Sequence, residues 1–169
     1  METPVKLYSL PFANVRTYLF ASLFVVGNIL LPQLCHLVPM GGQTLLPIYF
    51  FTLIAAYKFG FRVGLLTALL SPLINHWLFG MPPIAVLPAI LIKSGLLAAA
   101  AAYAARLTGK VSLTALLAVI LTYQVVGTLA EWALTGSFML AVQDFRIALP
   151  GMLIQWFGGF AVLKLLAKW

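Results

Sequence analysis

Acidic side chains are almost missing from this chain. Its 169 residues include three Asp and Glu against ten Lys and Arg, and only 8% of all residues are charged. A soluble domain needs far more charge on its water-facing surface, so this composition excludes the ordinary soluble globular class. The hydrophobic share of 63% and the mean hydropathy of +1.08 instead indicate a membrane protein.

Cysteine and catalytic motifs are also scarce. A single cysteine, Cys35, excludes an internal disulfide and a cluster of cysteine metal ligands. His36 and His76 could ligate a metal, but thiols and carboxylates are too sparse around them, so we predict neither a metal nor another cofactor. There is no nucleotide-binding loop, no H-E-x-x-H pair and no nucleophile elbow. We therefore expect no catalytic residues and a protein that is not an enzyme.

Basic residues alternate with long apolar runs. Eight of the ten lie on the same alternate side of these runs: Lys6, Arg16, Lys58, Arg62, Arg106, Lys110, Lys164 and Lys168. The connections around 37–43 and 79–83 carry no Lys or Arg. The positive-inside rule then predicts six crossings of the cell (inner) membrane, with both termini in the cytoplasm. Anionic lipid headgroups explain the net charge of +7, so no nucleic-acid partner is expected.

The apolar runs predict an all-α, six-transmembrane-helix bundle that forms one integral membrane domain over 1–169. The predicted helices cover about 15–37, 44–58, 62–79, 84–106, 112–134 and 147–167. The first run is of full length, so we interpret it as a span rather than a cleaved signal. The second is short, so it could be tilted or preceded by re-entrant backbone. The connection 135–146 is predicted to be an external loop.

Small residues predict where helices touch, because lipid gives apolar helices no hydrophobic reason to associate. Gly60 and Gly64 are four residues apart at the start of the third run. Gly151, Gln155 and Gly159 share one face of the last. We expect both sets to be packing faces.

Polar side chains deep in an apolar run are expensive and therefore informative. Lys93 lies roughly 14 Å below the external end of its helix, counting 1.5 Å per residue. Several helices bring polar groups to the external half, which predicts an outward-opening binding cavity. The candidate substrate-binding residues are Lys93, Asn75, His76, Gln124, Glu131, Gln155, Asn28 and Arg146.

These candidates have structural alternatives. Lys93 could bind an anionic group of the ligand, or it could pair permanently with Glu131. Glu131 could instead cap its helix. Asn75 and Gln124 could serve only as hydrogen bonds between helices.

Three tryptophans, Trp77, Trp132 and Trp156, are predicted to belong to the outer aromatic belt. One of them could stack on a planar ligand. Together with Lys93, they suggest a small ligand that is anionic and planar.

The clearest local pattern covers residues 55–66, Ala-Ala-Tyr-Lys-Phe-Gly-Phe-Arg-Val-Gly-Leu-Leu, and continues from Asn75 through Pro83. It combines a short second helix, a glycine-bracketed cytoplasmic turn and a third helix that ends in a Gly/Pro external loop. This pattern resembles the substrate-binding subunit (S component) of an energy-coupling factor (ECF) transporter. The resemblance implies high-affinity binding of a vitamin-like micronutrient. It also implies a transmembrane coupling subunit and two cytoplasmic ATPases as partners, with ATP hydrolysis in the latter.

In that family an alanine surface on the first helix meets the coupling subunit. The nearest match here is a small-residue stripe with Ala13, Thr17 and Ala21, and Ala98 and Ala102 on the fourth helix compete with it. A non-transport membrane scaffold or assembly factor is the alternative function, and a small intramembrane enzyme is a weaker one.

Overall fold

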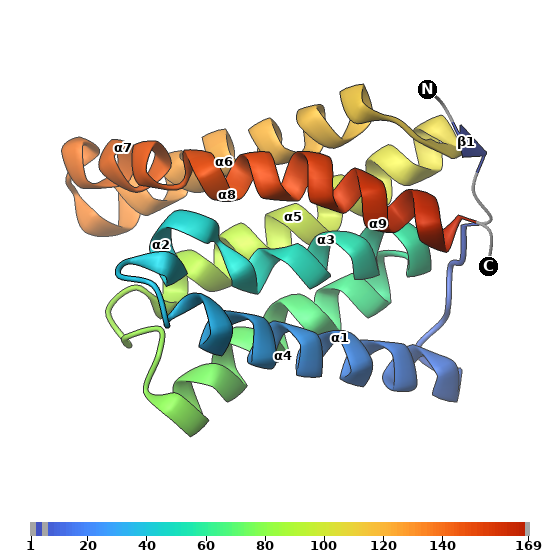
Figure 1. Ribbon diagram of the computed structural model, residues 1–169, viewed down its shortest axis with the longest axis horizontal. Helices are drawn as coiled ribbons and strands as arrows, with labels where there is room; N and C mark the ends of the chain where they lie inside the picture. The colour runs from blue at the N-terminus through green and yellow to red at the C-terminus, as the bar shows by residue number, and fades with distance from the viewer. Residues whose placement is uncertain (1–2, 5–6, 168–169) are drawn as a thin grey trace.

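The computed structural model describes residues 3–4 and 7–167, which form a bundle of helices along one long axis (Figure 1). The long helices are α1 (Val15–Cys35), α4 (Phe61–Phe79), α5 (Leu87–Thr108) and α6 (Leu113–Thr135). The shorter ones are α2 (Gly41–Leu45), α3 (Pro47–Phe59), α7 (Phe138–Ile147), α8 (Leu149–Leu153) and α9 (Gly159–Leu166), and a π-helical turn, η1 (Ile154–Gly158), joins the last two. The predicted all-α class is confirmed, apart from two residue pairs between β1 (Thr3–Pro4) and β2 (Lys110–Val111).

Four helical segments are long and apolar enough to cross a membrane: Val15–Cys35, Leu87–Thr108, Leu113–Thr135 and Leu149–Leu166. The chain is therefore a multi-pass membrane protein.

Helices α3 and α4 are not among the four. Helix α4 has 19 residues, but polar side chains such as Asn75 lower its hydropathy. Helix α3 has 13 residues, about 20 Å, against a hydrocarbon thickness of about 30 Å. Six crossings would require both of these helices to span.

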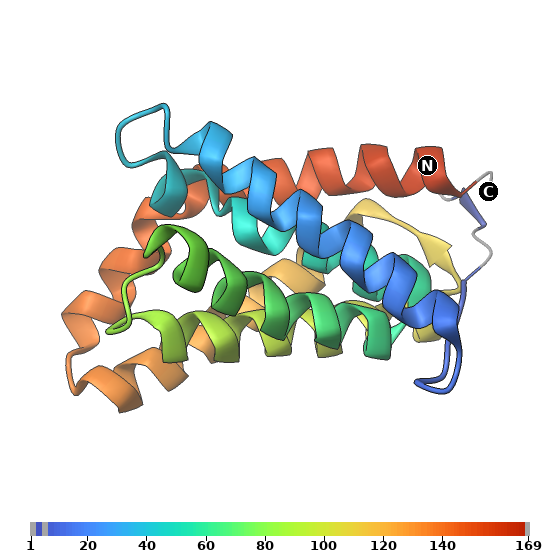
Figure 2. The ribbon, with the colours of Figure 1, turned by 90° about the horizontal axis from the view of Figure 1, so that it is seen from below.

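Helix α3 lies at the centre of the bundle, where it contacts α1, α4, α5 and α9 (Figures 1 and 2). Five consecutive residues from Leu53 to Tyr57 are fully buried. Other helices of the same chain therefore surround much of α3. A short helix is tolerated at membrane depth when other helices, rather than lipid, cover it.

The backbone breaks just before α3. The predicted second helix, 44–58, is divided at Leu46, which adopts a left-handed conformation with φ of 50°. This conformation is uncommon for a bulky side chain. Pro47 then opens α3 in the first helical turn, where its missing N–H is not needed. A separate five-residue helix, α2, precedes this break.

Glycines mark the closest helix contacts, as predicted. A Cβ added to Gly64 would lie 2.3 Å from the Cβ of Ala56, so α3 and α4 touch at this point. A Cβ on Gly151 would lie 2.6 Å from the backbone of Leu45. Gly159 and Gln155 on the same face are also buried. Both predicted packing faces are therefore confirmed.

The predicted loop 135–146 is wrong, because most of it forms α7. Gly136 ends α6 in the left-handed conformation. The hydroxyl of Ser137 then accepts a hydrogen bond from the backbone N–H of Leu140 and caps the new helix. Ala141 faces inward and is fully buried.

Most of the predicted coupling face also requires correction. Thr17, Ala21, Ala98 and Ala102 are at most 5% exposed, so these side chains pack inside the chain itself. Only Ala13 of the predicted set is exposed. The small residues bring α1 and α5 close to their neighbours, and they leave little surface for a partner.

Candidate functional site

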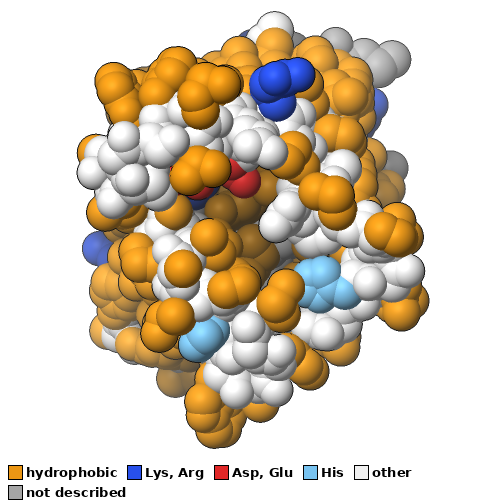
Figure 3. Space-filling view, turned by 90° about the vertical axis from the view of Figure 1, so that its left-hand side faces the viewer, with side chains coloured by type: hydrophobic (Ala, Val, Ile, Leu, Met, Phe, Trp, Pro, Cys, Tyr) orange, Lys and Arg blue, Asp and Glu red, His pale blue; other side chains and the backbone are white. Residues whose placement is uncertain are grey.

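A cavity of about 380 Å³ opens at one end of the bundle (Figure 3). Its walls come from residues 38–43, the beginning of α3, the 81–83 turn, the beginning of α5 and the facing parts of α6 and α7. The two connections that were predicted to be external, 37–43 and 79–83, thus border the same opening. Figure 3 shows acidic side chains at the wall of this hollow among mainly hydrophobic neighbours.

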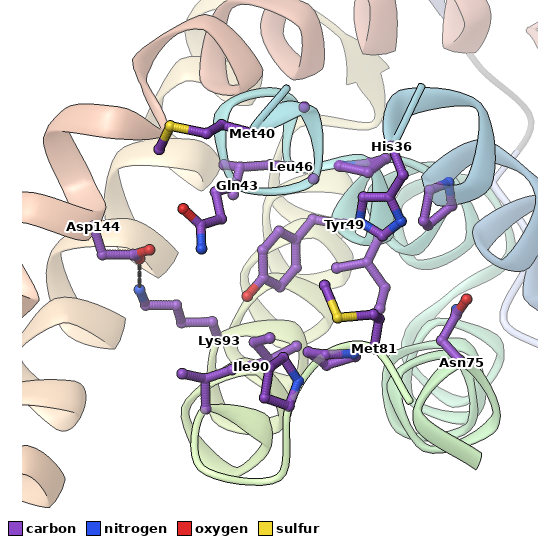
Figure 4. Close-up of a pocket in the computed structure, with 18 of the residues that line it drawn as sticks. His36, Met40, Gln43, Leu46, Tyr49, Asn75, Met81, Ile90, Lys93 and Asp144 are labelled. Atoms are coloured by element: carbon purple, nitrogen blue, oxygen red, sulfur yellow. Dashed lines mark hydrogen bonds and ion pairs between the residues drawn. The ribbon is translucent and has the colours of Figure 1, made fainter. Parts of the chain in front are cut away.

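A cluster of three charged residues forms one side of the cavity. The Nζ of Lys93 on α5 lies 2.6 Å from the Oε2 of Glu131 on α6. It also donates to the Oδ2 of Asp144 on α7 (Figure 4). The Lys93 and Glu131 side chains are 4% and 13% exposed, whereas Asp144 is 37% exposed. The pairing of Lys93 with Glu131, one of the two alternatives from the sequence, is what the structure shows.

The charges of this cluster do not cancel. Glu131 and Asp144 are the two acidic residues outside Glu2, and Glu2 lies outside the described residues. With all three groups ionised, the cluster has a formal charge of −1. Since a buried ammonium needs compensation, and two carboxylates already supply it, Lys93 does not need a ligand anion.

Gly127 makes room for the Lys93 side chain between α5 and α6. A Cβ at this position would lie 2.5 Å from the Cγ of Lys93 and 3.3 Å from its Cε. The lysine stem therefore runs directly over the glycine. This close approach allows the ammonium to reach carboxylates on two successive helices.

Asn75 on α4 lies across the cavity from Asp144 (Figure 4). Its Nδ2 donates to the carbonyl oxygens of Asn28 and Ser71, both at 2.9 Å. Two carbonyl acceptors fix the orientation of the amide, because only its NH₂ group can donate to them. The Oδ1 of Asn75 is buried and has no hydrogen-bond partner among the described residues. This oxygen offers almost no accessible surface to the cavity.

The remaining lining is mostly apolar. Met40, Leu46, Met81 and Ile90 surround the space, and the ring of Tyr49 stands among them (Figure 4). Gln43 and His36 add polar groups to the lining. A mainly apolar cavity with a few placed polar groups is typical of small-molecule sites.

Two predicted site residues instead hold the scaffold of the cavity. The Nδ2 of Asn28 lies 3.0 Å from the Oγ1 of Thr52 and 3.2 Å from the Oγ of Ser71, so Asn28 joins α1 to α3 and α4. The Nδ1 of His76 lies 2.8 Å from the carbonyl oxygen of Pro82 and ties the 80–83 turn to α4. Neither side chain lines the cavity.

Three further candidates also lie outside the lining. Gln124 is buried, and neither atom of its amide group has a partner among the described residues. Gln155, in the π-helical turn, accepts a hydrogen bond of 2.9 Å from the hydroxyl of Tyr123. Arg146 is exposed on α7. Of the eight predicted residues, the cavity brings together Lys93, Glu131 and Asn75.

The tryptophans do not contribute to the cavity either. The Nε1 of Trp156 donates to the carbonyl oxygen of Leu113, the first residue of α6, which lies far from the cavity. Trp77 is 81% exposed and Trp132 is 44% exposed. The aromatic side chain in the wall is Tyr49, which the sequence did not single out.

Asp144 is the most important residue that sequence reasoning missed. A helical reading of 138–147 would have placed Asp144 on the same face as Ala141 and Ala148, at spacings of three and four residues. Both alanines are fully buried. The available signal was therefore the Ser137 cap followed by this small-residue face.

Among the described residues, no three His, Cys, Asp or Glu side chains gather as metal ligands would. No family model, curated protein or solved structure matches this chain. The chemistry of the cavity is therefore the basis for assigning a function.

Proposed function

We propose that this chain is a membrane-embedded binding subunit for the uptake of a small, micronutrient-like molecule. The observation that carries the proposal is the cavity of about 380 Å³ in which both described acidic side chains converge on Lys93. Its volume lies within the usual range for ligand pockets. Charged groups among apolar helices are costly and mark ligand or ion pathways more often than packing.

The cavity favours a ligand with a positive charge or several N–H donors. Asp144 is the more exposed carboxylate, and the cluster retains one negative charge after Lys93 is paired. Asn75 lies on the opposite wall, and its amide NH₂ already donates to two backbone carbonyl oxygens. A flat ring between these walls would also contact Tyr49. This ligand class replaces the anion that Lys93 alone suggested.

The arrangement of charge supports an outward-facing cavity. The cavity end contains the connections 37–43 and 79–83, which lack Lys and Arg, and a single base on α7, Arg146. The opposite end contains Arg16, Arg62, Arg106, Lys110 and Lys164. We therefore propose that α3 and α4 also span, which gives six crossings with both termini in the cytoplasm of the cell membrane. Following the resemblance, a coupling subunit and two ATPases would energise transport.

Native mass spectrometry of gently purified protein tests the binding role. We expect a retained small molecule that the Asp144→Asn variant loses and the Arg146→Gln variant keeps, because Arg146 lies on the same helix outside the cavity. A retained molecule with net negative charge would contradict the ligand class but keep the binding role. The binding role itself would be wrong if wild-type protein retained no molecule and showed no saturable binding of cationic micronutrients.

Reconstitution into proteoliposomes tests the division of labour. We expect wild-type protein to bind ligand alone and to accumulate it only when coupling and ATPase subunits are added. Concentrative, ATP-driven uptake by the isolated chain would overturn the assignment as a binding subunit.

A further inference from the structure

A second hollow, a groove of about 610 Å³, lies toward the basic end of the bundle, away from the cavity. It follows the outer face of α5 from Leu96 to Arg106, a length of about 15 Å at 1.5 Å per residue. The small side chains of Ala99 and Ala100 leave space there between α4 and α6, both of which pack against α5. The groove thus joins the basic end of the bundle to its apolar flank.

Two arginines stand at the basic end of this groove. Arg62 and Arg106 both line it, and both are exposed. The Nη2 of Arg106 lies 3.4 Å from the Oγ of Ser9, and the Arg62 guanidinium lies 5.6 Å from the ring centroid of Phe12. Neither arginine forms an ion pair with a described residue, because both described carboxylates bind Lys93 at the other end. Within the described part of the chain, the two arginines therefore have no anionic partner.

The walls nearer the middle of the bundle are apolar. Leu96, Ala99 and Tyr103 form one side, and Tyr103 is 65% exposed. The hydroxyl of Thr122, on the α6 side, already donates to the carbonyl oxygen of Ala118 at 2.7 Å. Apart from the phenolic hydroxyl of Tyr103, these wall residues offer no free side-chain donor to a polar ligand, so this part of the groove suits a hydrocarbon chain.

We infer that this groove binds an anionic phospholipid, with its phosphate between Arg62 and Arg106 and one acyl chain along α5. Guanidinium groups bind phosphate through paired hydrogen bonds. Basic pockets at the cytoplasmic ends of transmembrane helices are typical sites for anionic headgroups. A helix of another protein in the same place would have to supply its own carboxylates to both arginines, whereas a phospholipid brings the anion and the apolar chain together.

Lipid retention in nanodiscs tests the headgroup contact. Wild-type protein in discs of phosphatidylcholine with phosphatidylglycerol should retain phosphatidylglycerol selectively when analysed by native mass spectrometry. We expect the Arg62→Gln/Arg106→Gln variant to bind it roughly thirtyfold more weakly, and Arg106→Gln alone about fivefold more weakly. Arg16→Gln removes the same charge from the same end outside the groove and should retain the lipid. Equal loss in Arg16→Gln, or no loss in the double variant, would overturn the site.

A second variant tests the acyl-chain contact while both arginines remain. Ala100→Phe should fill the groove and reduce phosphatidylglycerol retention at least tenfold. Millimolar inorganic phosphate should not compete with the lipid, and competition would show a site for the free anion instead. A photocrosslinker at Ala99 in native membranes should capture lipid. Capture of one defined protein there would show that a partner helix occupies the groove and would contradict the lipid assignment.

Discussion

The Nζ of Lys93 lies 2.6 Å from the carboxylate of Glu131 and also binds Asp144, so one ammonium joins three helices. Glu131 lies in the last turns of α6, and Asp144 lies on α7, which follows it. The cluster therefore performs two tasks at once. It fastens α7 over the cavity, and with all three groups ionised it leaves an excess negative charge in the cavity wall.

The first prediction concerns stability. Lys93→Met would leave two carboxylates close together without their cation, so we expect the free energy of unfolding to fall by about 2 kcal/mol or more. The partial exposure of Asp144 keeps this value below that of a fully buried pair. Thermal unfolding in detergent measures the change. Adding Glu131→Gln to Lys93→Met should restore part of the loss, and a Lys93→Met variant as stable as wild type would contradict the structural role of the cluster.

The second prediction separates binding from folding. Asp144→Asn leaves Lys93 paired with Glu131, so the remaining pair is neutral. The amide oxygen at position 144 can still accept a hydrogen bond from the Nζ of Lys93, so α7 should stay in place. Loss of the excess charge should weaken binding of a cationic ligand roughly tenfold or more. Titration of the ligand copurified with wild type, or of a panel of cationic micronutrients, measures the affinity. The thermal midpoint should change little, and an affinity equal to that of wild type would show that Asp144 does not contact the ligand.

The helices were largely predictable from the sequence, because length, apolar content and Pro/Gly boundaries are local properties. The predicted segment 62–79 and the observed α4 nearly coincide. Whether a small-residue face meets another protein or another helix of the same chain was not predictable in this way. Ala21 and Ala98 satisfy the same spacing rule whether they meet another protein or a helix of their own chain, and packing decides that they are buried.

The site, too, was predictable only in part from the sequence. The sequence offered the pairing of Lys93 with Glu131 as one of two alternatives, and the structure shows this pair. The interpretation of 135–146 as a loop gave no direction for Asp144, so the third member of the cluster was missed. Asn28 was misassigned because its depth resembles that of a ligand contact, whereas its amide is used by Thr52 and Ser71.

The third prediction concerns topology. In a Cys35→Ala background, Met81→Cys at the cavity end should react with a membrane-impermeant maleimide on intact cells. Arg16→Cys, at the basic end, should react only after the membrane is permeabilised. Both positions are exposed in the structure, so the difference reports the side of the membrane and not burial. The opposite labelling pattern would reverse the proposed orientation.

The last prediction uses two glycines of neighbouring helices as a matched pair. A Cβ on Gly127 would collide with the Lys93 stem at 2.5 Å, whereas a Cβ on Gly95 would meet nothing within 4 Å. Gly127→Ala should therefore displace Lys93 from its carboxylates and lower the free energy of unfolding by about 1–3 kcal/mol, the usual cost of overpacking.

Gly95→Ala should be neutral or slightly stabilising, since alanine is the better helix former. If the charge cluster builds the site, ligand affinity should fall in Gly127→Ala and stay unchanged in Gly95→Ala. Thermal unfolding and ligand titration on both variants decide the matter. Wild-type affinity in a destabilised Gly127→Ala protein would show that the position of Lys93 does not determine binding, and would limit the cluster to holding α7 in place.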